Sequence, residues 1–295
     1  MLKHLNEHPS APARVVVLGA SGFLGKALLA KLAERGIATL APTRSTLDLA
    51  ERDAASELER ILRPDDTLVM LAALTPDRGK DIATLMNNLA MAETVCRALA
   101  HKPVRHCIYV SSDAVYPFRG GLVNEQTAAE PADLYAAMHR TRELMFADAC
   151  GEISLAILRP TLLYGPGDTH NSYGPNRFRR QAAESGAISL GGEGEETRDH
   201  LFVEDAAGIL CDVIDHRSEG LLNVASGRSV TFMEIARMVA AQFDTPVEVK
   251  GSPRNMPVTH RTFDTTALLA AFPRITLTSL DDGLARAHRD VAPDR

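Results

Sequence analysis

The feature that most constrains the fold is a short apolar run that leads directly into a glycine-rich turn. Val15 to Leu18 are aliphatic, the turn GASGFLG follows them, and a helical pattern, KALLAKLAERG, follows the turn. Gly19 permits a tight turn, Gly22 lets the backbone approach a pyrophosphate, and Gly25 lets the helix meet the strand closely. The N–H groups at the start of the helix attract anions. This order predicts a dinucleotide site, with Ser21, Phe23 and Leu24 of the turn also in contact with the cofactor.

The residues after the second expected strand favour NADP over NAD. An acidic side chain about twenty residues after the glycine turn would bind the ribose 2′-hydroxyl of NAD, whereas an arginine suits the extra phosphate of NADP. This chain has Arg44 there and no carboxylate between Gly36 and Asp48. Asp48 and Leu49 are then expected to flank the adenine. A solvated surface arginine would have the same sequence, so NAD stays the alternative.

Strand-like and helical segments alternate along the chain. The expected strands are Arg14 to Leu18, Thr67 to Ala72, His106 to Val110, Ser154 to Arg159 and, later, Gly220 to Ser226. Helical patterns lie between them, and in one of these an apolar stripe is formed by Leu85, Leu89, Ala92, Cys96 and Leu99. Such alternation predicts an α/β fold with a doubly wound parallel sheet of Rossmann type. The striped helix is expected to pack on the sheet or on a partner subunit.

From Pro160 onward the composition changes to turn-forming residues, which indicates that the chain leaves the sheet. We therefore expect a smaller C-terminal α/β domain that binds the substrate. The expected division is a flexible arm at 1–13, a cofactor domain at 14–167 plus about 199–225, and a substrate domain at about 168–198 plus 226–295.

Composition excludes several classes of protein. The 295 residues are 45% hydrophobic and 24% charged, as in globular chains with a large core. A formal net charge of −6 gives no basic excess for nucleic-acid binding. The longest apolar runs are far shorter than the ~20 residues of a membrane-spanning helix. The first dozen residues lack the apolar stretch of a secretory signal, so we expect a cytoplasmic protein.

The cysteines agree with a reducing compartment. They show no CxxC spacing and no neighbouring histidine ladder, which favours buried thiols over disulfides or a metal site. The four positions are Cys96, Cys107, Cys150 and Cys211.

Motifs spread over nearly the whole chain resemble the extended short-chain dehydrogenase/reductases, in particular the NAD-dependent epimerase/dehydratase family that modifies nucleotide sugars. In order they are GASGFLG, NNLAMAETVCRAL, YVSSDAVYP at 109–117, LRPTLLYGPGD at 158–168 and TRDHLFVEDAA at 197–207. The resemblance implies a nicotinamide cofactor, a nucleotide-diphosphate sugar as substrate, and a homodimer formed by the helix ending near Ala100 and the one starting at Tyr135. It places Leu71, Ala72, Ala73, Asn88, Tyr135, His139 and Pro160 beside the cofactor.

The family's catalytic residues are a serine or threonine and a YxxxK pair. Ser112 matches the hydroxyl that binds the reacting sugar oxygen, and Tyr135 matches the acid/base. A cation four residues later would lower the phenol pKa from ~10 and hold the nicotinamide ribose. The residue there is His139, followed by Arg140. With a pKa near ~6.5, histidine would be mainly neutral at pH 7 unless a neighbour stabilises its charge.

This departure leaves three interpretations. His139 substitutes for the lysine, Arg140 or a charge on the bound cofactor takes over, or the site binds cofactor without fast turnover. If protonated His139 activates Tyr135, activity should peak near neutral pH and His139→Lys should extend it to higher pH.

The motifs leave the reaction open. Asp113 resembles the acid of the dehydratases, but Ala114 replaces their following glutamate, which argues against 4,6-dehydration. Epimerisation needs only transient oxidation at C4 and is narrowly favoured. Ketoreduction is the alternative, because Val115-Tyr116-Pro117 resembles reductases of the fucose-synthesis type and His170 could supply their extra acid. A catalytically impaired sensor of the NADP(H) pool is the alternative of another class.

The arginines are candidates for binding the nucleotide diphosphate, because a guanidinium offers bidentate, permanently charged donors. Besides Ser112, Asp113 and His170, the positions where the family contacts substrate are Asn176, Arg177, Arg198 and either Arg254 or Arg261. The structural alternative for Arg198 is an ion pair with Glu195 or Asp199.

Overall fold

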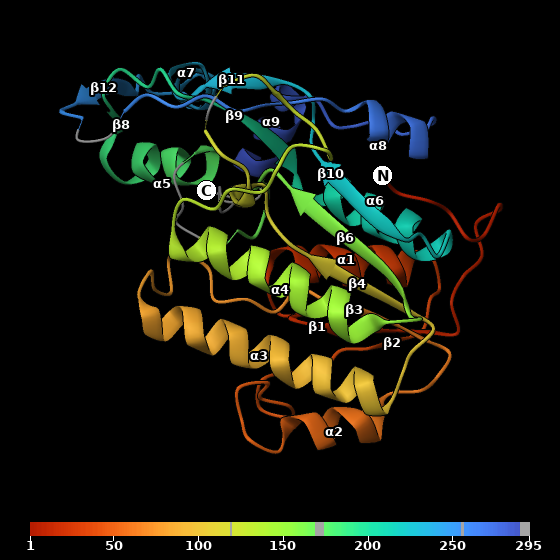
Figure 1. Cartoon of the computed structure of the whole chain (residues 1–295). Helices are drawn as coiled ribbons and strands as arrows, with labels where there is room; N and C mark the ends of the chain where they lie inside the picture. The colour runs from red at the N-terminus through yellow and green to blue at the C-terminus, as the bar shows by residue number, and fades with distance from the viewer. Residues whose placement is uncertain (119, 169–173, 255–256, 290–295) are drawn as a thin grey trace.

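The apolar runs join in one parallel sheet at the centre of the computed structural model, which describes residues 1–118, 120–168, 174–254 and 257–289 (Figure 1). The strand order is β10-β6-β4-β3-β1-β2. The bounds are Arg14–Leu18 (β1), Thr39–Leu40 (β2), Asp66–Met70 (β3), His106–Val110 (β4), Ser154–Pro160 (β6) and Gly220–Val224 (β10). The chain builds first to one side of β1 and then to the other, so a crevice opens at the carboxyl ends of β1 and β3. The predicted doubly wound sheet is confirmed.

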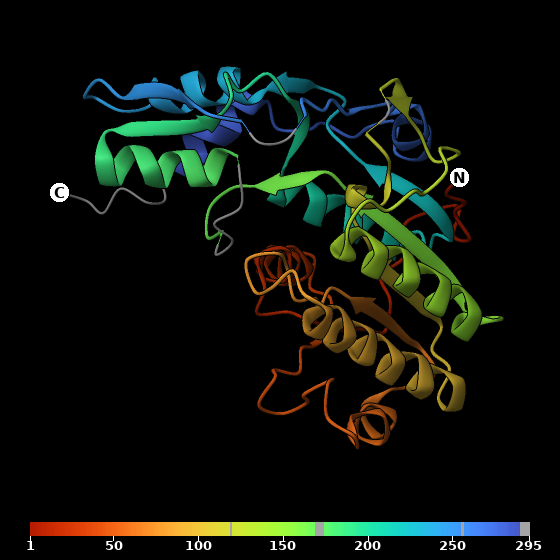
Figure 2. The same ribbon diagram turned by 60° about the vertical axis from the view of Figure 1, so that its left-hand side comes forward.

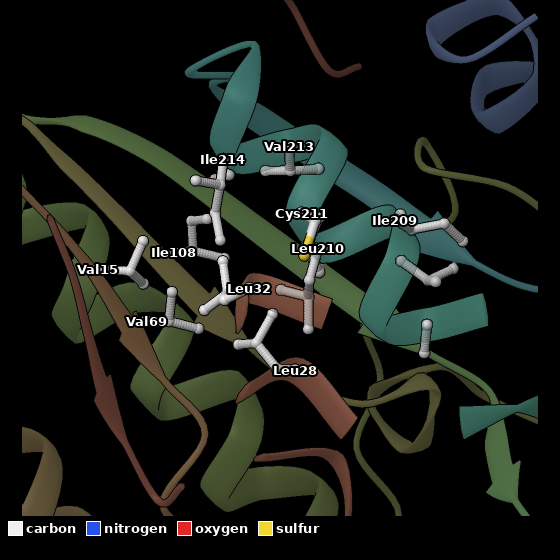
Figure 3. Close-up of a cluster of buried hydrophobic side chains, with 14 of the residues drawn as sticks. Val15, Leu28, Leu32, Val69, Ile108, Ile209, Leu210, Cys211, Val213 and Ile214 are labelled. Carbon is white, nitrogen blue, oxygen red and sulfur yellow. The ribbon is translucent and has the colours of Figure 1, made fainter. Parts of the chain in front are cut away.

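Alternation along the strands gives the sheet two apolar faces. Val15 and Val17 of β1 face one core cluster, whereas Val16 and Leu18 face another. The first face is covered by α1 (Phe23–Glu34) and α6 (Val203–Asp215), whose apolar side chains meet over the strands in Figure 3. The second is covered by α2 (Ala54–Ile61), α3 (Ile82–His101) and α4 (Leu134–Cys150). Figure 2 shows α3 and α4 running side by side.

The predicted stripe on α3 is only partly the face that packs on the sheet. Ala92 and Leu99 are buried, but Leu85, Leu89 and Cys96 are half-buried. The buried face also includes Asn88, Val95 and Ala98. The face that is buried is therefore rotated about the helix axis relative to the expected stripe.

A second group of elements builds the upper part of the molecule in Figure 1. Its sheets are β7 (Leu162–Tyr164), β9 (Thr197–Phe202) and β11 (Ser229–Thr231); β8 (Ala187–Gly191) with β12 (Glu248–Ser252); and β5 (Leu122–Val123) with β13 (Thr262–Phe263). Its helices are α5 (Pro175–Ser185), α7 (Phe232–Ala240), α8 (Thr266–Ala271) and α9 (Leu280–Arg289), and a 3-10 turn, η1, covers Asp113–Val115. A separate core cluster around Phe178, Ile188 and Phe232 holds most of these elements together.

The N-terminal arm differs from the loose segment that its composition predicts. The backbone of Lys3 exchanges hydrogen bonds with that of Glu219, both 2.8 Å long. The His4 ring contacts the Ser218 hydroxyl at 2.7 Å and the Ala271 carbonyl at 2.9 Å. The arm is therefore fastened between β10 and α8.

The prediction of buried thiols holds for three of the four cysteines. Cys107, Cys150 and Cys211 are buried, Cys96 is half-buried, and all four are free thiols. The described residues contain no group of three or more potential ligands arranged to hold a metal ion. They also contain no helix with the length and apolar character needed to cross a membrane.

Candidate active site

A cleft of about 900 Å³ opens at the carboxyl ends of the strands. The glycine turn between β1 and α1 forms one side, η1 and the start of α4 form the floor, and β9 with the segment around Arg261 forms the far side. The cleft brings together residues that are far apart in sequence. Of the predicted site residues, those that line it are Gly19, Ser21, Gly22, Phe23, Leu24, Gly25, Arg44, Asp48, Leu49, Leu71, Ala72, Ala73, Ser112, Asp113, Tyr135, His139, Pro160, Asn176, Arg198 and Arg261.

The glycine turn is packed too tightly for side chains. Gly19 has φ +93°, and a Cβ there would lie 2.6 Å from the Ala72 backbone nitrogen. A Cβ on Gly25 would lie 2.4 Å from the Gly19 carbonyl oxygen. Strand, turn and helix can approach this closely only through glycine, which leaves the N-terminus of α1 facing the cleft.

The predicted cofactor residues differ in how they reach the cleft. Arg44 is exposed at the rim, and its Nε donates to Asp48 at 2.8 Å. Asn88 is buried and is not among the residues that line the cleft. Its side chain accepts from the Leu74 N–H at 2.8 Å and donates to the Leu74 carbonyl at 3.0 Å. Asn88 thus fixes the loop that borders the cofactor side of the cleft.

Ser112 and Tyr135 meet on the floor of the cleft. Ser112 begins η1, where its hydroxyl accepts from the Ala114 N–H at 3.1 Å. Tyr135 lies in the first turn of α4, which Asp133 caps by accepting from the Ala136 N–H at 2.8 Å. Burial raises the pKa of Tyr135 to about 12, and Asp113 adds to this increase. Hydrogen bonding to Ser112 and the charge of Arg142 lower it.

His139 is neutral in this environment, which corrects the hypothesis that protonated His139 activates Tyr135. Only 3% of the residue is exposed. Burial and the positive charge of Arg142 lower the pKa of His139 to about 3. Its Nδ1 lies 2.8 Å from the Tyr109 hydroxyl, and its ring meets the Tyr135 ring edge-on with centroids 4.7 Å apart. A neutral pH optimum set by His139 is therefore not expected.

Arg140 does not replace the lysine either. Its Nη1 donates to Glu143 at 3.0 Å, and Arg140 does not line the cleft. Glu143 also receives two hydrogen bonds from Arg159, at 2.7 and 2.6 Å, and one from Ser111 at 2.7 Å. The charge of Arg140 is thus compensated on another side of α4.

The far side of the cleft carries two guanidinium groups around one aromatic ring. Arg261 lies over the Phe118 ring at 3.9 Å and Arg198 at 4.7 Å, measured from Cζ to the centroid. Arg261 donates to Asp113 at 2.9 Å and to the Tyr116 carbonyl at 2.6 Å. The pairing makes Asp113 a hydrogen-bond acceptor for arginine, which does not suit the acid of a dehydratase.

Arg198 has no carboxylate partner among the described residues, so the predicted alternative of an ion pair with Glu195 or Asp199 is wrong. It donates to the carbonyls of Thr197 and Thr259 at 2.9 and 2.8 Å. Burial, followed by repulsion from Arg261, lowers its pKa. Such a guanidinium favours an anionic ligand.

Of the other predicted substrate residues, some line the cleft and some do not. Asn176 lines the cleft and donates to Asp168 at 2.6 Å. Arg177 does not line it. Arg254 also lies outside, where Glu195, Glu196 and the Gly191 carbonyl receive its hydrogen bonds, so Arg261 is the one of the two predicted alternatives that lines the cleft. His170 lies outside the described residues.

Sequence reasoning missed three residues near the reacting groups. Phe118 follows the YVSSDAVYP motif directly, and both arginines contact its ring. Tyr109 and Arg142 lie behind His139. Arg142 could have been found, because positions 135, 139 and 142 share one helix face at i, i+4 and i+7.

Comparison with known proteins gives the same family as the motifs. Residues 15–225 match the NAD dependent epimerase/dehydratase family. The GDP-L-fucose synthase of Sinorhizobium fredii is 25% identical over 93% of this chain and 94% of its own length. The dTDP-L-rhamnose 4-epimerase of Burkholderia thailandensis is 28% identical over 58% of this chain and 49% of its own.

A similar fold is found among solved structures. One described as RMD from Pseudomonas aeruginosa complexed with NADPH superposes with a TM-score of 0.81 at 24% identity, covering 94% of this chain and 98% of that one. The fold, the residues that line the cleft and the family match all point to the same family. The chain belongs to the NAD dependent epimerase/dehydratase family.

Proposed function

We propose that this chain is a nucleotide-sugar epimerase-like oxidoreductase that acts through a transient 4-keto sugar and uses NADP(H). The observation that carries the proposal is the placement of Ser112 and Tyr135 on one floor, between the glycine turn and the arginine pair. A relative named as a 4-epimerase supports chemistry at the same carbon.

The residues present fit a nicotinamide dinucleotide. The glycine turn leaves backbone N–H groups facing the cleft, and the buried Nε2 of His139 has no hydrogen-bond partner among the described residues. A nicotinamide bound there would supply hydride transfer to and from C4 of the sugar. Ser112 would hold the C4 oxygen, to which Tyr135 gives a proton as the hydroxyl or from which it removes one as the phenolate.

The arginine pair would hold the diphosphate of the substrate. Arg198 is buried and forms no ion pair with a carboxylate of the described residues. Arg261 contacts the same aromatic ring, that of Phe118. Two adjacent guanidinium groups in a cleft are stabilised by a doubly charged ligand. The exposed Arg44 at the other rim would bind the 2′-phosphate of NADP.

Ketoreduction is a second candidate. Arg44 favours it, since NADPH is a reductant that such a reaction consumes. The two reactions differ in stoichiometry, because an epimerase returns its hydride whereas a reductase consumes one NADPH for each product.

The test is incubation with UDP-, GDP- and dTDP-linked sugars and their 4-keto forms. Products are identified by NMR, and NADPH consumption is followed by absorbance. We expect conversion of at least one sugar, and a loss of ~100-fold or more in kcat/KM for Tyr135→Phe. Tight cofactor binding with no conversion of any nucleotide sugar would contradict the proposal and support a sensor.

We also propose that the protein is a cytoplasmic homodimer. The four free thiols suit a reducing compartment. Exposed apolar side chains on the neighbouring helices α3 and α4, namely Ile82, Met86 and Leu144, support a helical dimer interface.

A further inference from the structure

The strongest unexplained feature is a buried positive charge on α4. Arg142 is 1% exposed, yet no carboxylate in the described part of the chain forms an ion pair with it. Its Nη2 donates to the Ala72 carbonyl at 2.9 Å, and its Nη1 lies 3.8 Å from the Met138 sulfur. The neighbouring Glu143 is committed to Arg140 and Arg159. Burying a charge without a counter-charge costs folding free energy, which suggests that the cation at this position has a function.

Arg142 is linked to the cleft through two rings. Its Cζ lies 5.7 Å from the centroid of the Tyr109 ring. The hydroxyl of Tyr109 in turn contacts the ring of His139. The distance from that hydroxyl to His139 Nδ1 is 2.8 Å.

The contact with Tyr109 occupies one ring nitrogen of His139 and leaves the other for a ligand. When the Tyr109 hydroxyl donates to Nδ1, the ring proton of the neutral imidazole lies on Nε2. Nε2 is buried and has no partner among the described residues, although His139 lines the cleft beside Tyr135. A buried N–H without a partner is itself a pointer to a ligand that accepts a hydrogen bond.

We propose that His139 and Arg142 divide between them the work expected of the missing lysine. Neutral His139 donates from Nε2 to a hydroxyl of the nicotinamide ribose, and Arg142 supplies the positive charge that stabilises the phenolate of Tyr135. This inference rests on the proposed function.

The proton step balances with these residues. When a keto sugar is reduced, the hydride comes from the nicotinamide, the O–H bond of Tyr135 breaks, and its proton forms an O–H bond at the C4 oxygen. The electron pair remains on the phenol oxygen, where Arg142 stabilises it until a proton from water restores the hydroxyl. Arg142 is a positioning residue in this scheme, because it acts on Tyr135 and does not touch the substrate.

The charge is tested with Arg142→Met and Arg142→Lys. The chain has five tyrosines and no tryptophan, so phenolate absorbance can be followed without indole interference. The absorbance of the Tyr135 phenolate is obtained by subtracting the titration curve of Tyr135→Phe from that of the parent protein. Only pH values at which circular dichroism shows folded protein are used. We expect Arg142→Met to raise the pKa of Tyr135 by on the order of one pH unit. The basic limb of the pH profile of kcat/KM should shift equally, and Arg142→Lys should restore both.

The matched control is Arg140→Met, which removes a cation from the same helix at a position paired with Glu143. It should leave the titration of Tyr135 unchanged. If Arg142→Met folds and titrates like the parent protein, or if Arg142→Lys fails to restore the profile, Arg142 does not supply the charge. If Arg142→Met does not fold, Arg142→Gln takes its place, since it also removes the charge but keeps an N–H donor for the Ala72 carbonyl.

The hydrogen bond is tested by cofactor affinity, measured by NADPH fluorescence. His139→Ala should weaken binding by ~10-fold, whereas His139→Gln, which keeps an N–H donor, should bind nearly as the parent does. Equal affinity of parent and His139→Ala would contradict this half of the proposal. Failure of the parent to bind NADP(H) or to convert any nucleotide sugar would instead contradict the proposed function, independently of these variants.

Discussion

At the scale of single residues, the glycine turn makes a sharp prediction. Gly19→Ala must accept both an unfavourable backbone, at φ +93°, and a Cβ 2.6 Å from the Ala72 nitrogen. Gly36→Ala is the matched control, because its φ is +66° but nothing lies within 4 Å of the added Cβ. We expect the control to lose about 1 kcal/mol and Gly19→Ala clearly more. Urea unfolding measures both, and equal losses would contradict the close approach.

Residues with a local signature could be predicted from the sequence, and those defined by tertiary contacts could not. Ser112 and Tyr135 belong to motifs, so their meeting in the cleft was expected. The charge state of His139 could not be decided from the sequence, because it depends on burial and on Arg142. Asn88 was predicted for the right region, but the bonds of its amide to the Leu74 backbone were not predictable from the motif.

At the scale of elements, α4 is tied to β6 by a buried ion pair that makes stability depend on pH. Burial would raise the pKa of Glu143, but hydrogen bonds from Arg159, and then Ser111, outweigh it and lower the pKa. A carboxyl with a depressed pKa in the folded state stabilises the fold above its unfolded pKa, near ~4.3. This contribution is lost as the pH falls from there through the lower folded value.

Glu143→Gln should therefore cost ~3–5 kcal/mol at neutral pH, because it leaves Arg159 buried without its counter-charge. The cost should shrink as the pH falls below ~4.3. Thermal unfolding across the acidic range checks this, with Glu34→Gln as the control, since Glu34 pairs with Lys31 on the exposed surface. A pH-independent difference between parent and variant would contradict the ion-pair account.

Strand positions were predictable because alternation and apolar runs are local. The predicted limits of the first and fourth sheet strands, Arg14–Leu18 and His106–Val110, coincide with those of β1 and β4. The predicted run Thr67 to Ala72 is too long at its end, because β3 ends at Met70 and Leu71 and Ala72 line the cleft. Apolar character alone does not distinguish a strand end from a cofactor-side loop.

At the scale of the whole molecule, contacts between distant segments set features that local patterns do not contain. Asp113 and Arg261 are 148 positions apart, and their pairing decides that Asp113 is held as an acceptor. The arm residue Lys3 pairs with Glu219, which directly precedes β10. The turn-rich composition after Pro160 indicated that the chain leaves the central sheet there, as it does between β6 and β7. Composition could not show which distant residues Asp113 and Lys3 contact.

The outer surface of α3 and α4 gives the prediction that concerns assembly. Met86 on α3 is 56% exposed and Leu144 on α4 is 55% exposed. Both helices run side by side in Figures 1 and 2. Pairing of this surface with its copy across a twofold axis would bury both side chains in each subunit. We expect the parent to sediment as a dimer and Met86→Glu with Leu144→Glu to sediment as a folded monomer, because charges there would be desolvated.

The control for that experiment is Leu269→Glu on α8, since Leu269 is 51% exposed but lies on another part of the molecule. It should leave the dimer intact and thereby separate a specific effect from a general effect of added charge. A monomeric parent, or a double variant that stays dimeric, would show that α3 and α4 do not form the interface. Because the cleft is built within one chain, dissociation should leave NADPH affinity within about a factor of two to three.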